Sequence, residues 1–388
     1  MLCCSGSLEG GGSERQLWQL ATGLDPQRLQ TEIYLLYRQG DYLSRIPARI
    51  PVHDFWSEHV PSRWTWPGQI RGQQIQQLKR IIRQQKIDCV YDRTFHMTLL
   101  TAAACRQTAT PRVSVIVSPP SQDFVRSRER FSWLKKRLLA AAYRDSLCRP
   151  VAVSAAVADD AAHFYGVPRE RFETIPSPID IAAVQQAAEE LLPEDHAPPA
   201  PNQHFQISVV GRLSAEKGQA LAIAAVAQLK EERPTLALRL NIIGDGPDRR
   251  ALQQLVEQLG LDASVHFTGR LANPYPWIRT ADLICIPSHY EGLPNVALEA
   301  MCLETPLLAT DCSGALRELL GNRERGVVVP IEAKALTAAM CDRLDAPDQW
   351  RRRTLAAAAW VQAKHGLGPW LQRMQGLLEQ RIESRNLA

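Results

Sequence analysis

Two cations on one predicted loop are the first candidates for chemistry in this 388-residue chain. Arg212 and Lys217 lie between an apolar run that ends at Val210 and a helical pattern that begins at Gly218. Guanidinium and ammonium groups make charge-assisted hydrogen bonds with phosphate oxygens, so this pair can contact a diphosphate from two sides. A surface loop with solvated charges would contain the same residue types, so the spacing alone leaves both interpretations open.

Two glutamates, Glu291 and Glu299, flank the start of another predicted helix. Pro294 suits the first turn of that helix, and Gly292 frees the backbone just before it. Unpaired N–H groups at a helix start attract phosphate, while carboxylates accept hydrogen bonds from sugar hydroxyls. The alternative is an acid that stabilises the helix dipole, together with a solvated glutamate inside the helix.

A glycine-rich turn, Gly10 to Gly12, follows the first short apolar run and opens a helical segment over residues 14–20. Glycines allow a ligand to approach the backbone closely, and the helix start attracts an anion. The turn lacks the lysine of a P-loop and the spacing of the dinucleotide fingerprint. By itself it also fits a flexible turn between a strand and a helix.

The elements that must position these residues alternate along almost the whole chain. Alternation of apolar runs with helical patterns predicts parallel sheets with crossover helices, and two such arrays predict two doubly wound α/β domains. Strands are predicted over residues 1–4, 33–36, 89–91, 113–117 and 151–154, and over 206–210, 237–243, 264–267, 283–287, 307–310 and 326–329.

The chain divides into four predicted parts. Residues 1–190 form the first domain, a proline-rich linker covers 191–203, residues 204–365 form the second domain, and residues 366–388 form a final helix. Charge differs between the parts, with a net charge of +10 over residues 1–150 and −8 over residues 151–300. Two modules with different partners are therefore expected.

Composition excludes several classes of protein. The net charge of +4 argues against a dedicated nucleic-acid binder. The nine cysteines include no CxxC pair and are expected to be buried free thiols. We find neither a long apolar run nor a signal-peptide pattern, and we expect a cytoplasmic chain.

The ordered motifs resemble the retaining glycosyltransferases of family 4, which have the GT-B fold. They are Gly11–Gln16, Gly211-Arg212-Leu213 with Lys217-Gly218, Gly244–Pro247, Phe267–Arg270, and Pro287-Ser288 followed by Glu291-Gly292-Leu293-Pro294 and Glu299. The resemblance implies two Rossmann-like domains facing each other across a cleft. It also implies transfer of a sugar from a nucleoside diphosphate sugar to a hydroxyl acceptor, without a metal or other cofactor. The last helix is expected to cross back to the first domain.

The resemblance assigns catalytic roles to Arg212 and Lys217 at the diphosphate and to Glu291 at the donor sugar. Glu299 matches the residue that binds the ribose hydroxyls. The other donor-binding residues it implies are Gly11, Gly12, Gly244, Arg270, Leu271, Gly292, Leu293, Pro294 and Asn295.

Candidates for the acceptor side come from the first domain. Many family members have a histidine after the strand predicted over residues 113–117, and Ser118 stands in that region here. His96 and Asp92 are nearby alternatives. The basic segment Arg126–Arg137 is a candidate for contact with an anionic membrane and would suit a lipid-linked acceptor. A solvated helix face is the alternative for that segment.

Two other functions fit parts of the pattern. A sugar-nucleotide epimerase shares the two-domain fold, but it would need acidic and histidine groups placed for elimination, and no such set is visible. A non-catalytic scaffold that binds sugar nucleotides would not need both cations and both glutamates.

Overall fold

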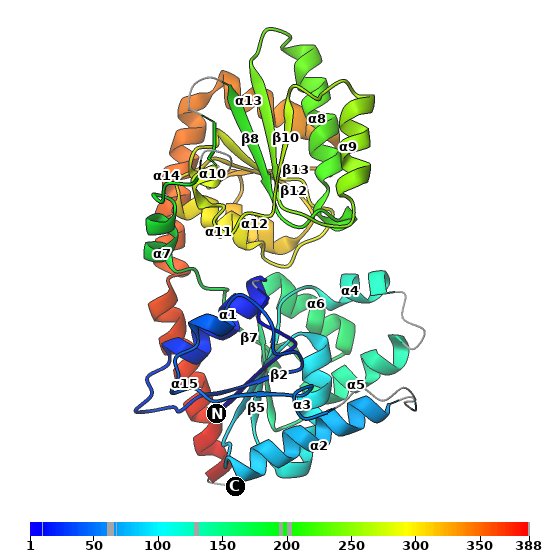
Figure 1. Ribbon diagram of the computed structural model, residues 1–388, viewed down its shortest axis with the longest axis vertical. Coiled ribbons are helices and arrows are strands. Elements are labelled where there is room, and N and C mark those ends of the chain that lie inside the picture. Colours follow the sequence, from blue (N-terminus) through cyan, green and yellow to red (C-terminus); the bar gives the residue numbers. More distant parts are fainter. Residues whose placement is uncertain are drawn as a thin grey trace. The chain divides into compact units, whose positions relative to one another are not determined.

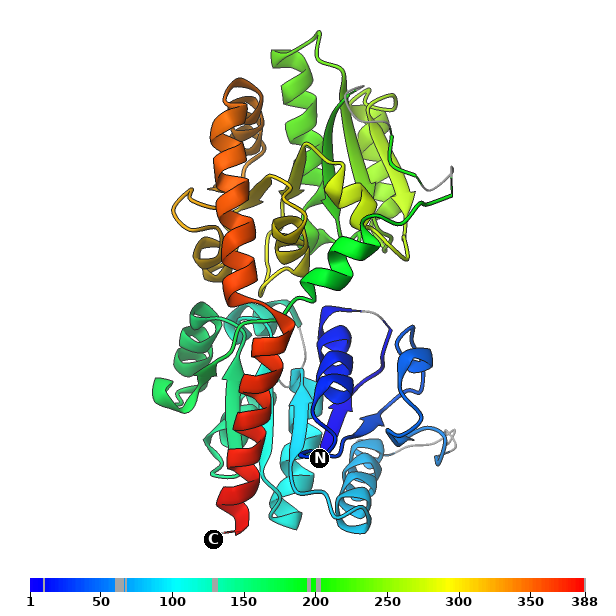
Figure 2. The same cartoon turned by 90° about the vertical axis from the view of Figure 1, so that its left-hand side faces the viewer.

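The computed structural model describes residues 1–9, 11–59, 66, 68–127, 132–193, 197–199 and 204–386. The chain forms two compact units, shown in Figures 1 and 2. The first contains Met1–Pro178 together with Gly368–Ala388, and the second contains Ile179–Leu367. Each unit is built around one parallel sheet.

The first unit contains a seven-stranded sheet in the order β3-β2-β1-β4-β5-β6-β7, with every strand pair parallel. The strands are β1 (Leu2–Ser5), β2 (Glu32–Leu35), β3 (Val52–Asp54), β4 (Val90–Arg93), β5 (Arg112–Ile116), β6 (Cys148–Ala152) and β7 (Glu173–Thr174). The helices are α1 (Gly12–Gly23), α2 (Gln69–Gln84), α3 (Phe95–Thr108), α4 (Pro120–Ser127), α5 (Ser132–Arg144), α6 (Ala155–Tyr165) and α15 (Leu367–Asn386), with short 3-10 turns η1 (Leu43–Arg45) and η2 (Arg169–Arg171).

Helix α15 returns the chain to the first unit and packs beside α1, as Figure 2 shows. Gly23 at the end of α1 makes the approach possible, because a Cβ there would lie 2.7 Å from Leu371 of α15. Arg28 and Glu379 then form an ion pair of 2.5 Å. With helices on both faces, central strands such as β1 and β4 are buried along their whole length.

The second unit contains a six-stranded parallel sheet in the order β10-β9-β8-β11-β12-β13. The strands are β8 (Phe205–Val210), β9 (Leu238–Ile243), β10 (Val265–Gly269), β11 (Leu283–Ile286), β12 (Leu307–Thr310) and β13 (Val327–Val329). The helices are α7 (Ile181–Ala187), α8 (Gln219–Glu232), α9 (Arg249–Gln258), α10 (Tyr275–Arg279), α11 (Asn295–Cys302), α12 (Gly314–Leu320), α13 (Ala333–Asp345) and α14 (Pro347–Lys364), with the 3-10 turn η4 (Ala215–Lys217).

Strand alternation divides the core of the second unit into two clusters. Cys285 and Leu308 belong to the cluster that includes residues of α8, α9 and α13; Figure 1 shows α8 and α9 side by side. Their neighbours Ile284 and Leu307 belong to the other cluster, with α11. Because successive side chains of a strand point to opposite faces, the continuous apolar runs of the sequence fill both layers.

The structure differs from the sequence predictions in two places. Strands β3 and β7 were not predicted, because both are very short and neither has a continuous apolar run. The first unit ends at Pro178 rather than in the segment 191–203, which lies partly outside the described residues. The reason is that Ile179 and Val184 of the α7 region are buried in the core of the second unit.

Candidate functional site

Glycines allow the backbones of the loops after β8 and β9 to pack closely against each other. A Cβ on Gly244 would lie 2.0 Å from the carbonyl oxygen of Gly211, and a Cβ on Gly246 would lie 2.3 Å from that of Leu213. The backbone N–H of Leu213 donates to the carbonyl of Asp245 at 3.0 Å. No side chain can occupy this contact, which fixes the backbone that carries Arg212.

Arg212 and Lys217 stand at the two ends of the loop after β8. Arg212 is exposed, and its carbonyl accepts a hydrogen bond of 2.9 Å from Gln219, which anchors the backbone. Lys217 ends the turn η4 and is followed by Gly218, whose φ of +65° favours glycine. A Cβ on Gly218 would also lie 2.0 Å from the carbonyl oxygen of Pro287, so this loop is pressed against the end of β11.

The Glu291 carboxylate lies against Lys217. The Lys217 Nζ is 2.6 Å from Glu291 Oε1, and the hydroxyl of Ser288 donates to the same oxygen at 2.8 Å. Glu291 is only 8% exposed. A buried carboxylate needs such partners, because removal of a charge from water is costly unless the charge is paired and hydrogen-bonded.

These residues meet where the strand order of the sheet reverses. From β8 the chain builds outward through β9 and β10 on one side, and β11, β12 and β13 follow on the other. Open α/β sheets bind ligands outside the carboxyl ends of their strands at such a switch point. Arg212 and Lys217 follow β8, and Glu291 follows β11. Arg270 and Leu271 follow the edge strand β10, two strands away from β8.

The segment Gly292–Asn295 leads into α11, with Pro294 as the residue before its first turn. Glu299 lies within α11 and is 7% exposed, so it is not a solvated helix glutamate. Cys312 lies near Glu291. Burial, with a smaller contribution from the Glu291 charge, raises the pKa of this thiol to about 12. Cys312 is therefore neutral and no nucleophile at pH 7.

In the first unit, the glycine-rich turn leads directly into a helix, as predicted. Gly12 is the first residue of α1, and Gly11 precedes it without a capping side chain. A Cβ on Gly11 would lie 2.3 Å from a carboxylate oxygen of Glu14. The turn follows β1, which pairs with β4 where the order of this sheet also reverses. Gly10 lies outside the described residues.

Asp92 has a structural role that the sequence did not predict. Its side chain is fully buried and accepts hydrogen bonds from the hydroxyls of Thr98 at 2.6 Å, Thr101 at 2.7 Å and Ser114 at 2.8 Å. Burial raises its pKa, and the buried charge of Arg112 opposes that shift. Strand alternation points Asp92 into the layer between β4 and α3, where it joins sheet and helix; its place on the acceptor side stays a prediction.

His96 and Ser118 remain at the carboxyl edge of the first sheet. His96 is exposed in the first turn of α3. Ser118 follows β5, and its hydroxyl donates to Asp123 Oδ2 of α4 at 2.5 Å. Sequence analysis missed Asp123, although its position five residues after Ser118 across a helix start was a usable signal. Ser288 was part of a quoted motif but was assigned no role of its own.

Helix α5 carries an apolar and basic face. Trp133 is 63% exposed, and Leu134, Arg137 and Leu138 are exposed with it; we call these four residues the α5 face. The neighbouring Lys136 instead covers an aromatic ring, with its Nζ 3.9 Å from the centroid of Phe164. The first part of the predicted basic segment, residues 128–131 and the side chains of 126 and 127, lies outside the described residues. Within the described chain, no helix is both long and apolar enough to cross a membrane.

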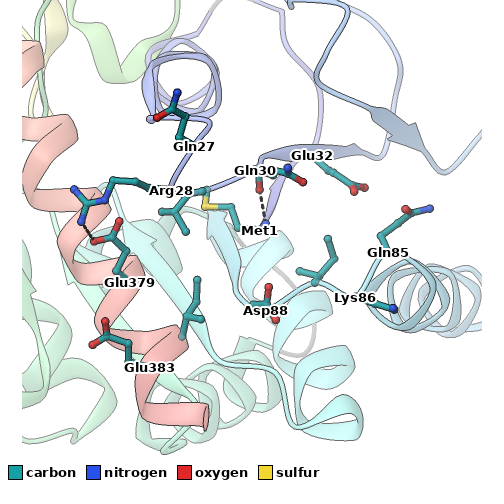
Figure 3. A pocket seen from close by; sticks show the side chains of 13 residues that line it. Met1, Gln27, Arg28, Gln30, Glu32, Gln85, Lys86, Asp88, Glu379 and Glu383 are labelled. Atoms are coloured by element: carbon teal, nitrogen blue, oxygen red, sulfur yellow. Dashed lines mark hydrogen bonds and ion pairs between the residues drawn. The ribbon is translucent and has the colours of Figure 1, made fainter.

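A cavity of about 430 Å³ lies at the opposite edge of the first sheet (Figure 3). Glu32 and Asp88 line it where β2 begins and just before β4, Glu379 and Glu383 come from α15, and Arg28 and Lys86 add positive charge. The predicted donor-binding residues lie on loops and helices that follow the carboxyl ends of strands, where open α/β sheets bind ligands. This cavity is therefore separate from the candidate site.

Comparisons with known proteins match both units. The family described as "Glycosyltransferase Family 4" matches residues 10–183, and the family described as "Glycosyl transferases group 1" matches residues 204–346. The crystal structure of HepE from Anabaena in complex with UDP has a TM-score of 0.78 at 21% identity, over 98% of this chain and 99% of that one. The chain therefore belongs to the family 4 glycosyltransferases and has the GT-B fold.

Curated relatives share part of their length with this chain. A D-inositol 3-phosphate glycosyltransferase of Nocardia farcinica is 32% identical over 60% of this chain and 51% of its own. The N-acetylgalactosamine-N,N'-diacetylbacillosaminyl-diphospho-undecaprenol 4-alpha-N-acetylgalactosaminyltransferase of Campylobacter jejuni is 29% identical over 45% of this chain and 44% of its own. The chain thus spans about half or less of the length of such relatives.

Proposed function

We propose that this protein is a retaining glycosyltransferase that moves a sugar from a nucleoside diphosphate sugar to a hydroxyl acceptor. One observation carries the proposal. At the switch point of the second sheet, Lys217 is held 2.6 Å from the buried Glu291, on a loop that also presents the exposed Arg212. Cations for a diphosphate and a carboxylate for sugar hydroxyls are thereby placed together.

Arg212 and Lys217 bind the diphosphate and stabilise the charge that develops as it leaves. The bond from the anomeric carbon to the diphosphate oxygen breaks, and the acceptor oxygen bonds to that carbon on the same face. The acceptor proton passes to the departing phosphate oxygen. Glu291 accepts a hydrogen bond from the donor sugar, and Glu299 accepts from the ribose. The other predicted donor-binding residues contact the same nucleotide sugar.

The two cations and the start of α11 supply positive charge at the diphosphate, so we propose that transfer needs no metal. Activity that survives chelation with EDTA would support this point, and loss that Mg²⁺ or Mn²⁺ restores would contradict it.

We place the acceptor on the first unit and propose that it is a glycan, a glycolipid or a lipid-linked intermediate. Support comes from the Campylobacter relative, whose name includes a diphospho-undecaprenol acceptor. The α5 face fits the same class, because apolar residues flanked by cations bind anionic membrane surfaces. We therefore propose peripheral attachment at the inner face of the plasma membrane.

A screen of nucleotide sugars tests the function. Thermal shifts with UDP-glucose, UDP-galactose, UDP-N-acetylglucosamine and GDP-mannose identify the donor, and release of the nucleoside diphosphate then reports its consumption. We expect a shift with at least one donor that the Arg212→Ala variant loses. Absence of stabilisation by all four, together with no release of nucleoside diphosphate, would overturn the proposal.

A further inference from the structure

The hydroxyl of Ser288 lies at the centre of a buried contact that the proposed chemistry does not use directly. Ser288 is 1% exposed and donates to Glu291 Oε1 at 2.8 Å. Lys217 donates to the same oxygen at 2.6 Å. Among the described residues, the hydrogen bonds of the Glu291 carboxylate thus converge on Oε1, which leaves Oε2 for a ligand.

The backbone around Ser288 is held from two sides. The hydroxyl of Thr310, which is fully buried at the end of β12, bonds to the carbonyl of Ser288. The N–H of His289 donates to the carbonyl of Glu216 at 2.8 Å. The carbonyl oxygen of Pro287 would lie only 2.0 Å from a Cβ on Gly218, so the two backbones are in close contact. The Ser288 hydroxyl is therefore presented from a backbone that cannot shift easily.

We infer that Ser288 is a positioning residue that sets the orientation of the Glu291 carboxylate. A glutamate side chain has several rotatable bonds, and a single ion pair with a flexible lysine leaves it free to rotate. A second hydrogen bond from a fixed hydroxyl selects one orientation. In that orientation Oε1 keeps Lys217 in place for the diphosphate, and Oε2 accepts a hydrogen bond from a hydroxyl of the donor sugar.

This inference rests on the proposed function, and its test separates the two. The probe is the nucleotide sugar selected by the screen, and wild-type protein must bind and consume it. If wild-type protein does neither, the proposed function fails before Ser288 is tested.

The first comparison uses Ser288→Ala and Ser288→Thr. Loss of a hydrogen bond to a charged group predicts that Ser288→Ala lowers kcat by about tenfold to a hundredfold. The affinity for the free nucleoside diphosphate should change by about threefold or less, since Ser288 touches the carboxylate and not the phosphate. Ser288→Thr keeps the hydroxyl and should recover most of kcat. Ser264→Ala is a matched control, because Ser264 is also buried and bonded to a lysine, Lys230, but precedes β10 at the other edge of the sheet.

A double-mutant cycle distinguishes positioning from packing. If Ser288 acts through Glu291, Ser288→Ala should add little to the loss of kcat caused by Glu291→Gln. Full additivity of the two losses, or a wild-type kcat in Ser288→Ala, would overturn the inference. If Ser288→Ala does not fold, Ser288→Cys keeps the volume with a weaker donor, and the same cycle is measured with it.

Discussion

At the scale of single residues, the ion pair between Lys217 and Glu291 predicts different effects of substitution at the two residues proposed to bind the diphosphate, Lys217 and Arg212. Lys217→Ala removes a cation and also leaves the buried Glu291 charge without its partner. Arg212→Ala removes only an exposed cation. We expect kcat/KM for the donor to fall about tenfold to a hundredfold in Arg212→Ala and further in Lys217→Ala. Arg233→Ala, an exposed arginine at the end of α8, is the control and should match wild type. Unchanged turnover in both site variants would contradict the assignment.

The two glutamates should separate nucleotide binding from transfer. Glu299→Ala is expected to weaken binding of the free nucleoside diphosphate about tenfold, because its proposed partner is the ribose. Glu291→Gln should bind the nucleoside diphosphate nearly as well as wild type, since the amide oxygen can still accept a hydrogen bond from Lys217, while kcat for transfer falls. Isothermal titration with the nucleoside diphosphate and a transfer assay measure the two effects. Equal nucleotide affinity in Glu299→Ala and wild type would contradict the proposed binding of the ribose by Glu299.

The Ser118 hydroxyl donates a hydrogen bond to Asp123, and we propose that it shapes the sugar pocket and does not act as a base. A positioned base contributes about 10²–10⁴-fold to a rate. We expect Ser118→Ala to lower kcat by less than that range, with donor affinity intact. A thousandfold fall in a folded variant would instead place Ser118, or a water it holds, in the proton path.

At the scale of elements, Asp92 connects β4, β5 and α3. Asp92→Ala removes the acceptor that three buried hydroxyls share, and it leaves the buried Arg112 with Asp145, 3.8 Å away, as its ion-pair partner. Loss of a buried hydrogen-bond partner costs about 1–3 kcal/mol, so urea unfolding of the first unit should occur at lower denaturant concentration. Nucleotide binding by the second unit should persist below that transition. A fully stable variant that lost only acceptor affinity would instead support a role for Asp92 in acceptor binding.

At the scale of the whole molecule, the α5 face predicts membrane association. Sedimentation with vesicles that contain phosphatidylglycerol should exceed that with pure phosphatidylcholine, because each cation near an anionic surface contributes about 1 kcal/mol. The double variant Trp133→Ser/Leu134→Ser should bind the anionic vesicles about tenfold more weakly. Leu355→Ser removes a comparably exposed side chain from α14 and serves as the control. Identical sedimentation of all three proteins would contradict a role for this face.

Much of the protein is determined locally by its sequence. Short apolar runs bounded by helical patterns identify strands such as β11 and β12, because burial on both faces favours continuous apolar side chains. The residues that follow parallel strands lie at one edge of the sheet, and the resemblance to family 4 glycosyltransferases assigned Arg212 and Glu291 at that edge to a common donor. Strands β3 and β7 were not predicted, because segments of three and two residues are too short to show a hydrophobic periodicity.

Only the tertiary structure decided which of those residues meet. Lys217 and Glu291 are 74 residues apart, and their contact exists because β8 and β11 are neighbours in the sheet. The burial of Asp92 depends on which face of β4 packs against α3. The hydrogen bond from Ser288 to Glu291 depends on the position of the loop that Thr310 of the neighbouring strand β12 holds. Strand order and loop packing arise from contacts between distant segments, and these contacts leave no periodic signal in the sequence.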